Sequence, residues 1–377
     1  MRLRDLGFLL AFSTALLPLG TLLLAQRGVP LDLAAWYPLA FIFAVVPLID
    51  AACGVDRLSW DSSAQLVKLE RRRYFRVLTL LILPLWLCTL AWCTWQFIHL
   101  PFGPWGTLGW VLTTGVIGGT LAINPAHELI HKSGPLEPLV GGVLLTSVGY
   151  PGFKVEHVRG HHLHVATPRD SSSAHLGESV YAFVPRALWR NVRNAWRLES
   201  QRLRLRGLSP WSWRNEMLGW YLLWLGFMLV FVALGGVRGL LFFLTQGLLA
   251  AATLEVINYI EHYGLSRREV APGRYERVTH HHSWNAPQRY TNWLLFNLQR
   301  HSDHHAQPRR RYQALVHHED SPQLPAGYAS MFVLALMPPL WHRVMDHRAL
   351  AVGAKSDART DKAVEDPAPK FTSSNAR

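Results

Sequence analysis

The sequence predicts an all-α integral membrane protein with six transmembrane helices and a histidine-rich cap at the cytoplasmic face. Half of the 377 residues are hydrophobic, and they gather in long apolar runs. About 20 apolar residues in a helix cross the hydrocarbon layer of a bilayer. Lys and Arg exceed Asp and Glu by 38 to 25, a net charge of +13. The histidines cluster in polar segments that follow the apolar runs, so the cap and the spans are separate in sequence.

The apolar runs define the predicted spans, at about residues 6–25, 34–49, 77–97, 108–126, 218–234 and 240–259. Arg2 and Arg4 precede the first run, as in a signal peptide, but a signal core has about 7–15 residues and this run is longer. The loop of residues 50–76 is rich in Lys and Arg, which places it in the cytoplasm by the positive-inside rule. Six spans then put both termini on the cytoplasmic side.

Two shorter apolar stretches and the C-terminal end complete the predicted organisation. Residues 139–150 are too few to cross a bilayer, so we expect a re-entrant or interfacial piece, and residues 328–340 are predicted to be interfacial. Residues 1–350 form one membrane-embedded domain. Residues 351–377 have almost no large apolar side chain and are predicted to be a disordered tail.

Three histidine clusters carry the predicted chemistry. On a helix, side chains three and four positions apart share a face, so we expect the rings of each cluster to converge on one point. Zinc normally takes four ligands, and these clusters hold twice that number, so two metal ions are implied. The clusters follow spans four and six, and their members are His127 and His131; His157, His161 and His162; and His301, His304 and His305.

A ninth histidine and four carboxylates complete the predicted site. His262 ends the sixth span, and with it each of two ions has four or five imidazoles. A carboxylate next to a ligand histidine accepts its outer ring N–H and fixes the tautomer. We expect this role, or direct ligation by one of them, for Glu128, Glu156, Glu261 and Asp303. His164 and His280–His282 are interpreted as relays, supporting groups or surface residues.

The types of ligand residue leave several metals and several protein classes possible. All-imidazole ligation suits iron, copper, zinc or nickel, and iron is favoured because a paired redox metal at a membrane face suits oxygen activation. The motif from His127 to His131 alone also fits a zinc protease with Glu128 as base. A membrane metal transporter would instead carry polar ligands along its spans. The three cysteines form no paired Cys-x-x-Cys site, so electrons must come from another protein.

Four motifs resemble those of the membrane-bound non-haem diiron alkane 1-monooxygenases (alkane hydroxylases), within the integral-membrane fatty acid desaturase/hydroxylase superfamily. They are His-Glu-Leu-Ile-His-Lys at 127, the segment 156–170, Asn-Tyr-Ile-Glu-His-Tyr-Gly-Leu at 258 and Leu-Gln-Arg-His-Ser-Asp-His-His at 298. The first, second and fourth carry the histidine order of the whole superfamily. The motif at 258 and the segment 298–315 are more specific to alkane hydroxylases.

This resemblance implies a function and a set of cofactors. The nine histidines would hold two iron ions in a catalytic cap, with O2 as co-substrate. Medium- to long-chain n-alkanes would be hydroxylated to 1-alkanols, with two electrons from rubredoxin and its NAD(P)H-dependent reductase. The protein would lie in a bacterial-type inner membrane, with the active site on the cytoplasmic side and no nucleic acid partner. The alternatives are a fatty-acyl desaturase and a xylene-type aryl-methyl monooxygenase.

Two further features bear on substrate and partner. Where the resembled family usually continues with Pro-Ala after Asp170, this chain has Ser171-Ser172-Ser173. The basic run Arg309–Arg311 fits the positive-inside rule, and it is also a candidate for steering an acidic rubredoxin.

Overall fold

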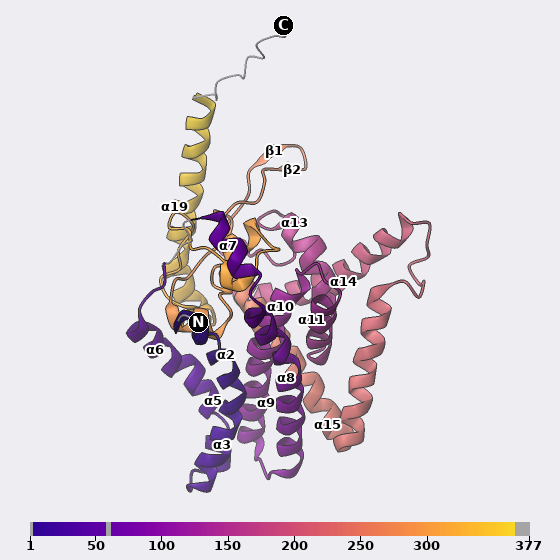
Figure 1. The fold of residues 1–377 in the computed structure, drawn as a ribbon. Helices are drawn as coiled ribbons and strands as arrows, with labels where there is room; N and C mark the ends of the chain where they lie inside the picture. The colour runs from indigo at the N-terminus through magenta and orange to yellow at the C-terminus, as the bar shows by residue number, and fades with distance from the viewer. Residues whose placement is uncertain (1–2, 58–61, 366–377) are drawn as a thin grey trace.

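The computed structural model describes residues 3–57 and 62–365, and most of this part of the chain is helical. Two short antiparallel strands form a hairpin at the outer edge of the cap (Figure 1). The helices and strands are α1 Leu3–Gly7, α2 Leu10–Ser13, η1 Thr14–Leu16, α3 Leu17–Gln26, α4 Leu31–Ala34, α5 Tyr37–Ala40, η2 Phe41–Val45, α6 Val46–Cys53, α7 Ser63–Glu70, α8 Arg73–His99, α9 Pro104–Gly118, η3 Gly119–Ile123, α10 Asn124–Ile130, α11 Leu136–Ser147, α12 Gly152–Glu156, η4 His157–His161, α13 His162–His164, α14 Val180–Arg204, α15 Glu216–His262, β1 Glu269–Ala271, β2 Arg274–Tyr275, α16 Arg289–Leu294, α17 His301–Ala306, η5 Tyr312–Ala314, α18 Tyr328–Ala335 and α19 Pro338–Glu365.

The long apolar helices form one layer of the molecule, below the cap in Figure 1. Within the described residues, five helical stretches have the length and apolar composition to cross a membrane. Each of the first four stretches contains one predicted apolar run, and the last contains both the fifth and the sixth. Their bounds are Arg4–Gln26, Leu31–Cys53, Ala64–His99, Pro104–Ile130 and Glu216–His262.

The last of these stretches is bent rather than straight. Gly235 and Gly236 depart from helical backbone angles, and Gly236 has a φ of 58°, a left-handed conformation that glycine adopts without steric cost. Figure 1 shows the two limbs of α15 meeting at this bend. The bend lies between the fifth and sixth predicted spans, which end at residue 234 and begin at residue 240. The count of six spans, with both termini in the cytoplasm, stays a prediction.

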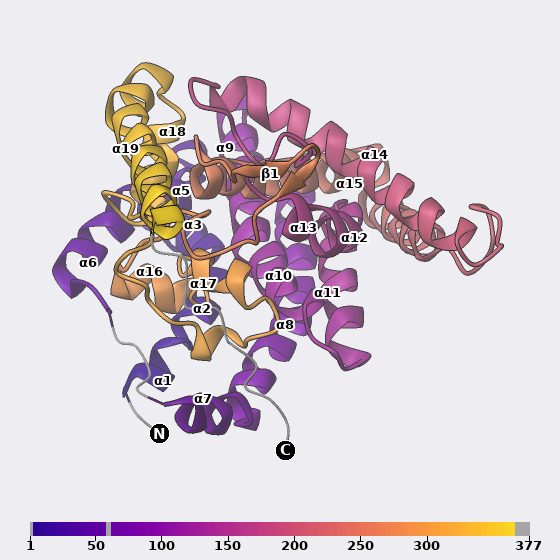
Figure 2. The same cartoon turned by 90° about the horizontal axis from the view of Figure 1, so that it is seen from above.

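Residues 127–315 supply most of the cap. Seen from above, α10, α12, α13 and α17 lie together near the centre, between α19 on one side and the outer end of α14 on the other (Figure 2). The short apolar helix α11 packs beside α10, at the stretch predicted to be too short to span. Segments far apart in sequence therefore bring their histidines to one place.

The C-terminal region differs from its prediction. The stretch predicted as one interfacial piece, residues 328–340, contains α18 and then the start of α19. Helix α19 continues to Glu365, so residues 351–365 of the predicted disordered tail are helical. Alanine and long charged side chains, which favour helices, recur through this segment. The rest of the predicted tail, residues 366–377, lies outside the described residues.

Candidate metal centre

All nine predicted histidines converge, and they do so as two separate groups. In each group every residue offers a ligand atom within 4.8 Å of the others, and eight of the nine residues are buried. The first group has five members and the second has four, which matches the predicted division of four or five imidazoles for each ion. The groups are His127, His131, His157, His162 and His304; and His161, His262, His301 and His305.

The distances between ring nitrogens are those of ligands that share an ion. In the first group, His162 Nε2 lies 3.0 Å from His157 Nε2 and 3.1 Å from His304 Nε2. Two imidazoles bound at about 2.1 Å and at right angles on one metal place their nitrogens about 3.0 Å apart. The rings are therefore spaced to hold one ion between them.

The second group has the same spacing. His305 Nε2 lies 2.9 Å from His301 Nε2 and 3.2 Å from His161 Nε2, and His301 Nε2 lies 3.2 Å from His262 Nε2. The other ring nitrogen of His262 faces the carbonyl of His282 at 3.4 Å. That carbonyl accepts the outer N–H and leaves Nε2 to bind a metal.

The second histidine cluster, predicted to lie within one helical turn, is divided between the two groups. Residues His157–His161 form a π-helical turn, η4, in which the amide of His162 donates to the carbonyl of His157. Five positions make one turn there, so His157 and His162 share a face. His161 is directed to the second group instead. Single π turns interrupt α-helices often at functional sites, and the histidine spacing alone gave no sign of this one.

The third cluster is also divided, although its backbone is α-helical. His301 and His305, four positions apart on α17, belong to the second group, whereas His304 belongs to the first. The prediction that all three converge on one point is therefore wrong. The three rings lie on adjacent faces of one turn, between the two groups, so α17 contributes to both.

The donor set fits a pair of metal ions. His127 Nε2 and His131 Nε2 are buried and have no hydrogen-bond partner, a costly arrangement unless a ligand is bound. Burial, together with the neighbouring histidines, holds the pKa values of His304 and His305 well below the usual range for histidine. These two rings are therefore neutral at physiological pH, the form in which imidazole binds metals.

Two carboxylates contact ligand histidines. Asp170 Oδ2 lies 3.0 Å from His161 Nδ1, the nitrogen opposite the one that faces His305. Glu261 Oε2 lies 3.1 Å from His301 Nε2, on the side of the second group, and its Oε1 accepts a hydrogen bond from the Tyr328 hydroxyl. Asp170 was not among the predicted carboxylates, although its position at the end of the 156–170 motif could have indicated it.

Glu128 and Asp303 have structural contacts in place of the predicted contacts to ligand rings. Glu128 pairs with Lys132 at 2.8 Å and accepts from the amide of Tyr312. Asp303 pairs with Arg310 at 2.6 Å and accepts from the amide of Val316. Both carboxylates thus hold the segment after α17 in place. They are adjacent in sequence to His127 and His304, but their carboxylates are engaged by Lys132 and Arg310.

Glu156 is linked to the departure from the family pattern at Ser171. The Ser171 hydroxyl donates to Glu156 Oε1 at 2.5 Å, and the Ser173 hydroxyl donates to Asp170 Oδ2 at 2.6 Å. Burial and the nearby charge of Asp170 raise the pKa of Glu156 to about 7. Glu156 therefore lies behind His161 in a small polar network. A proline at 171 would have no hydroxyl to donate to it.

The other histidines of the cap lie outside the two groups. His164 is partly exposed on α13. His282 contributes its carbonyl to His262 while its ring lies 3.4 Å from Glu276. His280 belongs to a third and more exposed cluster, with His318 and Asp320.

The basic run after α17 is mostly engaged within the protein. Arg310 pairs with Asp303, and Arg311 pairs with Glu137 at 2.8 Å. Lys132 Nζ donates to the carbonyl of Arg310 at 3.0 Å, which fixes the backbone of the run. Arg309 has an exposed side chain. The predicted patch therefore offers less free charge than its sequence indicates.

An apolar cavity leads toward the first histidine group. It has a volume of about 70 Å³ and lies between α9, α15, α16 and α18, with Phe43, Ile257 and Phe332 in its wall. A smaller cavity of about 10 Å³ touches His127 and His304. Both cavities are lined by Asn124 and Leu298. These two residues therefore stand between the apolar space and the histidines.

Comparison with known proteins shows the family to which the chain belongs. Residues 102–335 match the fatty acid desaturase family. The chain is 49% identical over 317 residues to alkane 1-monooxygenase 2 of Pseudomonas aeruginosa, covering 84% of each chain. It is 45% identical over 353 residues to alkane 1-monooxygenase 2 of Alcanivorax borkumensis, covering 93% of this chain and 92% of the relative.

A more distant relative represents one of the alternatives. The hydroxylase component of xylene/toluene monooxygenase from Pseudomonas putida is 30% identical over 238 residues, which cover 63% of each chain. The identity is lower and the coverage shorter than for the alkane enzymes. The chain is therefore an oxidoreductase of the alkane 1-monooxygenase family, within the fatty acid desaturase superfamily.

Proposed function

We propose that this protein hydroxylates the terminal carbon of medium- to long-chain n-alkanes to 1-alkanols at a diiron centre, using O2 and two electrons from rubredoxin. The observation that carries the proposal is the pair of histidine groups, the first of which borders a small cavity that shares Asn124 and Leu298 with the apolar cavity. A lipid-soluble substrate can reach such a site without crossing water.

The two histidine groups would each hold one iron ion. When bound, the iron pair supplies the activation of O2 that hydroxylation of an alkane C–H bond requires. Glu261 lies beside His301 Nε2, on the side of the second group, where it would be available to ligate the ion. The protein holds two other rings in place from outside: Asp170 contacts His161 Nδ1, and the His282 carbonyl faces His262 Nδ1. Such outer contacts fix the tautomer and the orientation of metal-binding histidines.

Substrate position follows from the two cavities. An alkyl chain in the larger cavity would lie against Phe43, Ile257 and Phe332 and would point its end past Leu298 toward His127 and His304. The apolar wall binds the chain by burying its surface and keeps water from the reacting carbon. The Asn124 amide nitrogen is buried without a partner in this passage, where it is available to a product hydroxyl.

The electron donor and the membrane orientation belong to the same proposal. We propose an inner-membrane protein with the cap and both termini in the cytoplasm, where rubredoxin and its NAD(P)H-dependent reductase are found. The basic loop of residues 50–76 supports this orientation by the positive-inside rule. The exposed charge of Arg309 remains a candidate for steering an acidic donor.

Product analysis tests the reaction. Cells that express the protein with a rubredoxin and its reductase are fed C6 to C16 alkanes, and the products are separated by gas chromatography. We expect 1-alkanols, and we expect them to be lost in His304→Ala and retained in His347→Ala, which changes an exposed histidine of α19. A protein that contains two irons but yields no alkanol would contradict the proposal. Methylbenzyl alcohol from xylene, or unsaturated acyl chains from saturated ones, would support the alternatives.

A further inference from the structure

A third cluster of metal-binding side chains lies in the cap, apart from the nine histidines. His280, His318 and Asp320 each offer a ligand atom within 4.8 Å of the others. The residues come from two loops, one before Trp284 and one after η5. None of them belongs to the predicted ligand set, and the reaction proposed above makes no use of them.

One distance in this cluster is close to that expected around a tetrahedral ion. His280 Nε2 lies 3.0 Å from Asp320 Oδ2, and His318 offers a ligand atom within 4.8 Å of those of both residues. With metal–ligand bonds of about 2.1 Å, the donor atoms around a tetrahedral ion are about 3.4 Å apart. The rings of His280 and His318 stack with centroids 4.4 Å apart, so the two loops meet at these side chains.

His318 already has the outer contact that metal-binding histidines usually have. Its Nε2 lies 3.0 Å from Asp303 Oδ1, and Asp303 is itself held by Arg310. A carboxylate that accepts the N–H of one ring nitrogen leaves a lone pair on the other. His318 is therefore prepared to bind a cation through Nδ1, and the contact connects the cluster to α17.

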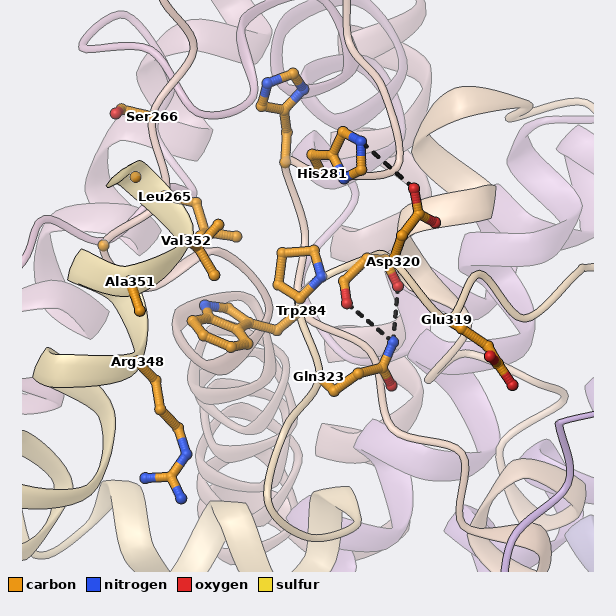
Figure 3. Close-up of a pocket in the computed structure, with 15 residues that line it drawn as sticks. Leu265, Ser266, His281, Trp284, Glu319, Asp320, Gln323, Arg348, Ala351 and Val352 are labelled. Carbon is orange, nitrogen blue, oxygen red and sulfur yellow. Dashed lines mark hydrogen bonds and ion pairs between the residues drawn. The ribbon is translucent and has the colours of Figure 1, made fainter. Parts of the chain in front are cut away.

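Asp320 of this cluster lines a cavity of about 520 Å³, whose wall also includes His281 and Trp284 (Figure 3). In Figure 3, His281 and Asp320 face each other on one side, with Arg348 and Val352 across the cavity. The side chain of Asp320 is 55% exposed, whereas that of His280 is 28% exposed. An ion can reach the cluster from solvent, and water can complete its coordination.

We propose that His280, His318 and Asp320 form a third metal site, for a divalent cation of the zinc type. Two imidazoles and one carboxylate with no thiolate suit Zn²⁺ and similar ions. The bound ion would join the loop that carries His280 to the loop that carries His318. These loops also meet where the Asn285 amide donates to the carbonyl of Pro322 and the Leu324 amide donates to the carbonyl of Asn285. The ion would thus brace the outer wall of the second histidine group.

Metal binding to the full-length, iron-loaded protein in detergent tests this proposal. The protein is dialysed against Zn²⁺ alone, and zinc and iron are counted by mass spectrometry. We expect one equivalent of zinc in addition to two of iron. His280→Ala and Asp320→Asn should weaken zinc binding at least tenfold and leave the iron unchanged. His347→Ala, at an exposed position on α19, is the matched control and should bind zinc as the unchanged protein does.

Three results would overturn the proposal: no zinc beyond the iron equivalents, zinc that enters only as iron leaves, or a third equivalent that both His280→Ala and Asp320→Asn retain. Asp320 lies at the surface, so Asp320→Asn keeps the test valid if His280→Ala fails to fold. The measurement uses neither alkane nor electron donor. Its outcome is therefore separate from that of the proposed hydroxylation.

Discussion

The Nε2 atoms of His157 and His162 lie 3.0 Å apart although the residues are five positions apart in sequence. The π-helical turn η4 produces this proximity, and it also directs His161 to the other histidine group. The local winding of the backbone therefore decides which group each ring of this motif joins.

Gly160 lies within this turn, and a side chain there should disturb it. An added Cβ would lie 2.9 Å from Glu156 Oε1 and 3.2 Å from Leu198 Cδ1. We expect Gly160→Ala to lower metal content and to cost about 1–3 kcal/mol of stability, as overpacking does. Metal analysis and thermal unfolding in detergent measure both effects. Gly219→Ala is the control, since its Cβ meets nothing within 4 Å; equal behaviour of the two variants would contradict the role of the turn.

Asp170 should matter for metal affinity more than for folding. Asp170→Asn retains the size of the side chain but removes the charge that orients His161 through Nδ1. Loss of such an outer contact costs roughly 10–100-fold in metal affinity or activity. We expect a loss of this size in iron titrations, with the second histidine group affected first. Glu319→Gln, at an exposed carboxylate, serves as the control, and an unchanged iron affinity in Asp170→Asn would refute the assignment.

The wall of the apolar cavity should set the range of substrate lengths. Ala329 lines this cavity from α18, so a phenyl ring at this position would fill space that a long alkyl chain needs. We expect Ala329→Phe to shift the ratio of products toward shorter alkanols, several-fold, in a competition between C8 and C16 alkanes. Ala329→Ser, which adds little volume, should leave the ratio unchanged. The same ratio in all three proteins would show that the chain lies elsewhere.

The ion cluster at Glu199 should make stability depend on pH. Glu199 is buried on α14; burial alone would raise its pKa, but hydrogen bonds from Arg202, from the Glu216 amide and from Arg159 lower it to about 2. The unfolded chain takes up this proton near pH 4.3. The stabilisation is therefore present above that pH and is lost as the pH falls toward 2, and it is on the order of 2 kcal/mol.

Glu199→Gln tests this dependence. We expect the variant to unfold at a lower temperature than the unchanged protein at pH 7, with the difference shrinking below about pH 4. Glu319→Gln is again a suitable control because its carboxylate is exposed. A difference in unfolding temperature that stays constant from pH 7 to pH 3 would rule out the ionised carboxylate as its source.

Charge reversal at Arg309 distinguishes electrostatic attraction of the electron donor from a structural role of the basic run. Arg309→Glu should slow electron transfer from rubredoxin several-fold at low ionic strength, with a smaller effect at high salt. Arg310→Glu should in addition reduce stability, because it breaks the pair with Asp303. Stopped-flow reduction measures the rates, and Arg214→Glu, an exposed arginine after α14, is the control. Identical salt dependence in Arg309→Glu and the unchanged protein would exclude steering.

The sequence was sufficient to predict long apolar helices and the gathering of the nine histidines in the cap, because both follow from local patterns. Apolar runs of span length and histidines one turn apart are visible without a structure. The division of the histidines between two groups depends on a π turn in one case and on the rotation of α17 between the groups in the other. Neither the π turn nor the rotation of α17 can be recognised from the spacing of the histidines in the sequence.

The carboxylates that contact the histidines are likewise only partly predictable from the sequence. Glu128 and Asp303 are adjacent to ligands in sequence, yet they pair with Lys132 and Arg310, whereas Asp170 reaches His161 from nine positions away. The helix that continues to Glu365 is not predicted from the sequence either. Few apolar residues indicate disorder, whereas the alanines and long charged side chains of this segment favour a helix.

The sharing of turns between the two histidine groups has a consequence for assembly. The turn from His157 to His162 and helix α17 each contribute rings to both groups. An ion that binds first would fix both turns, and would thereby arrange His161, or His304, for the ion that follows. Filling of the two positions is thus expected to be cooperative, with the half-filled protein a minor species during maturation.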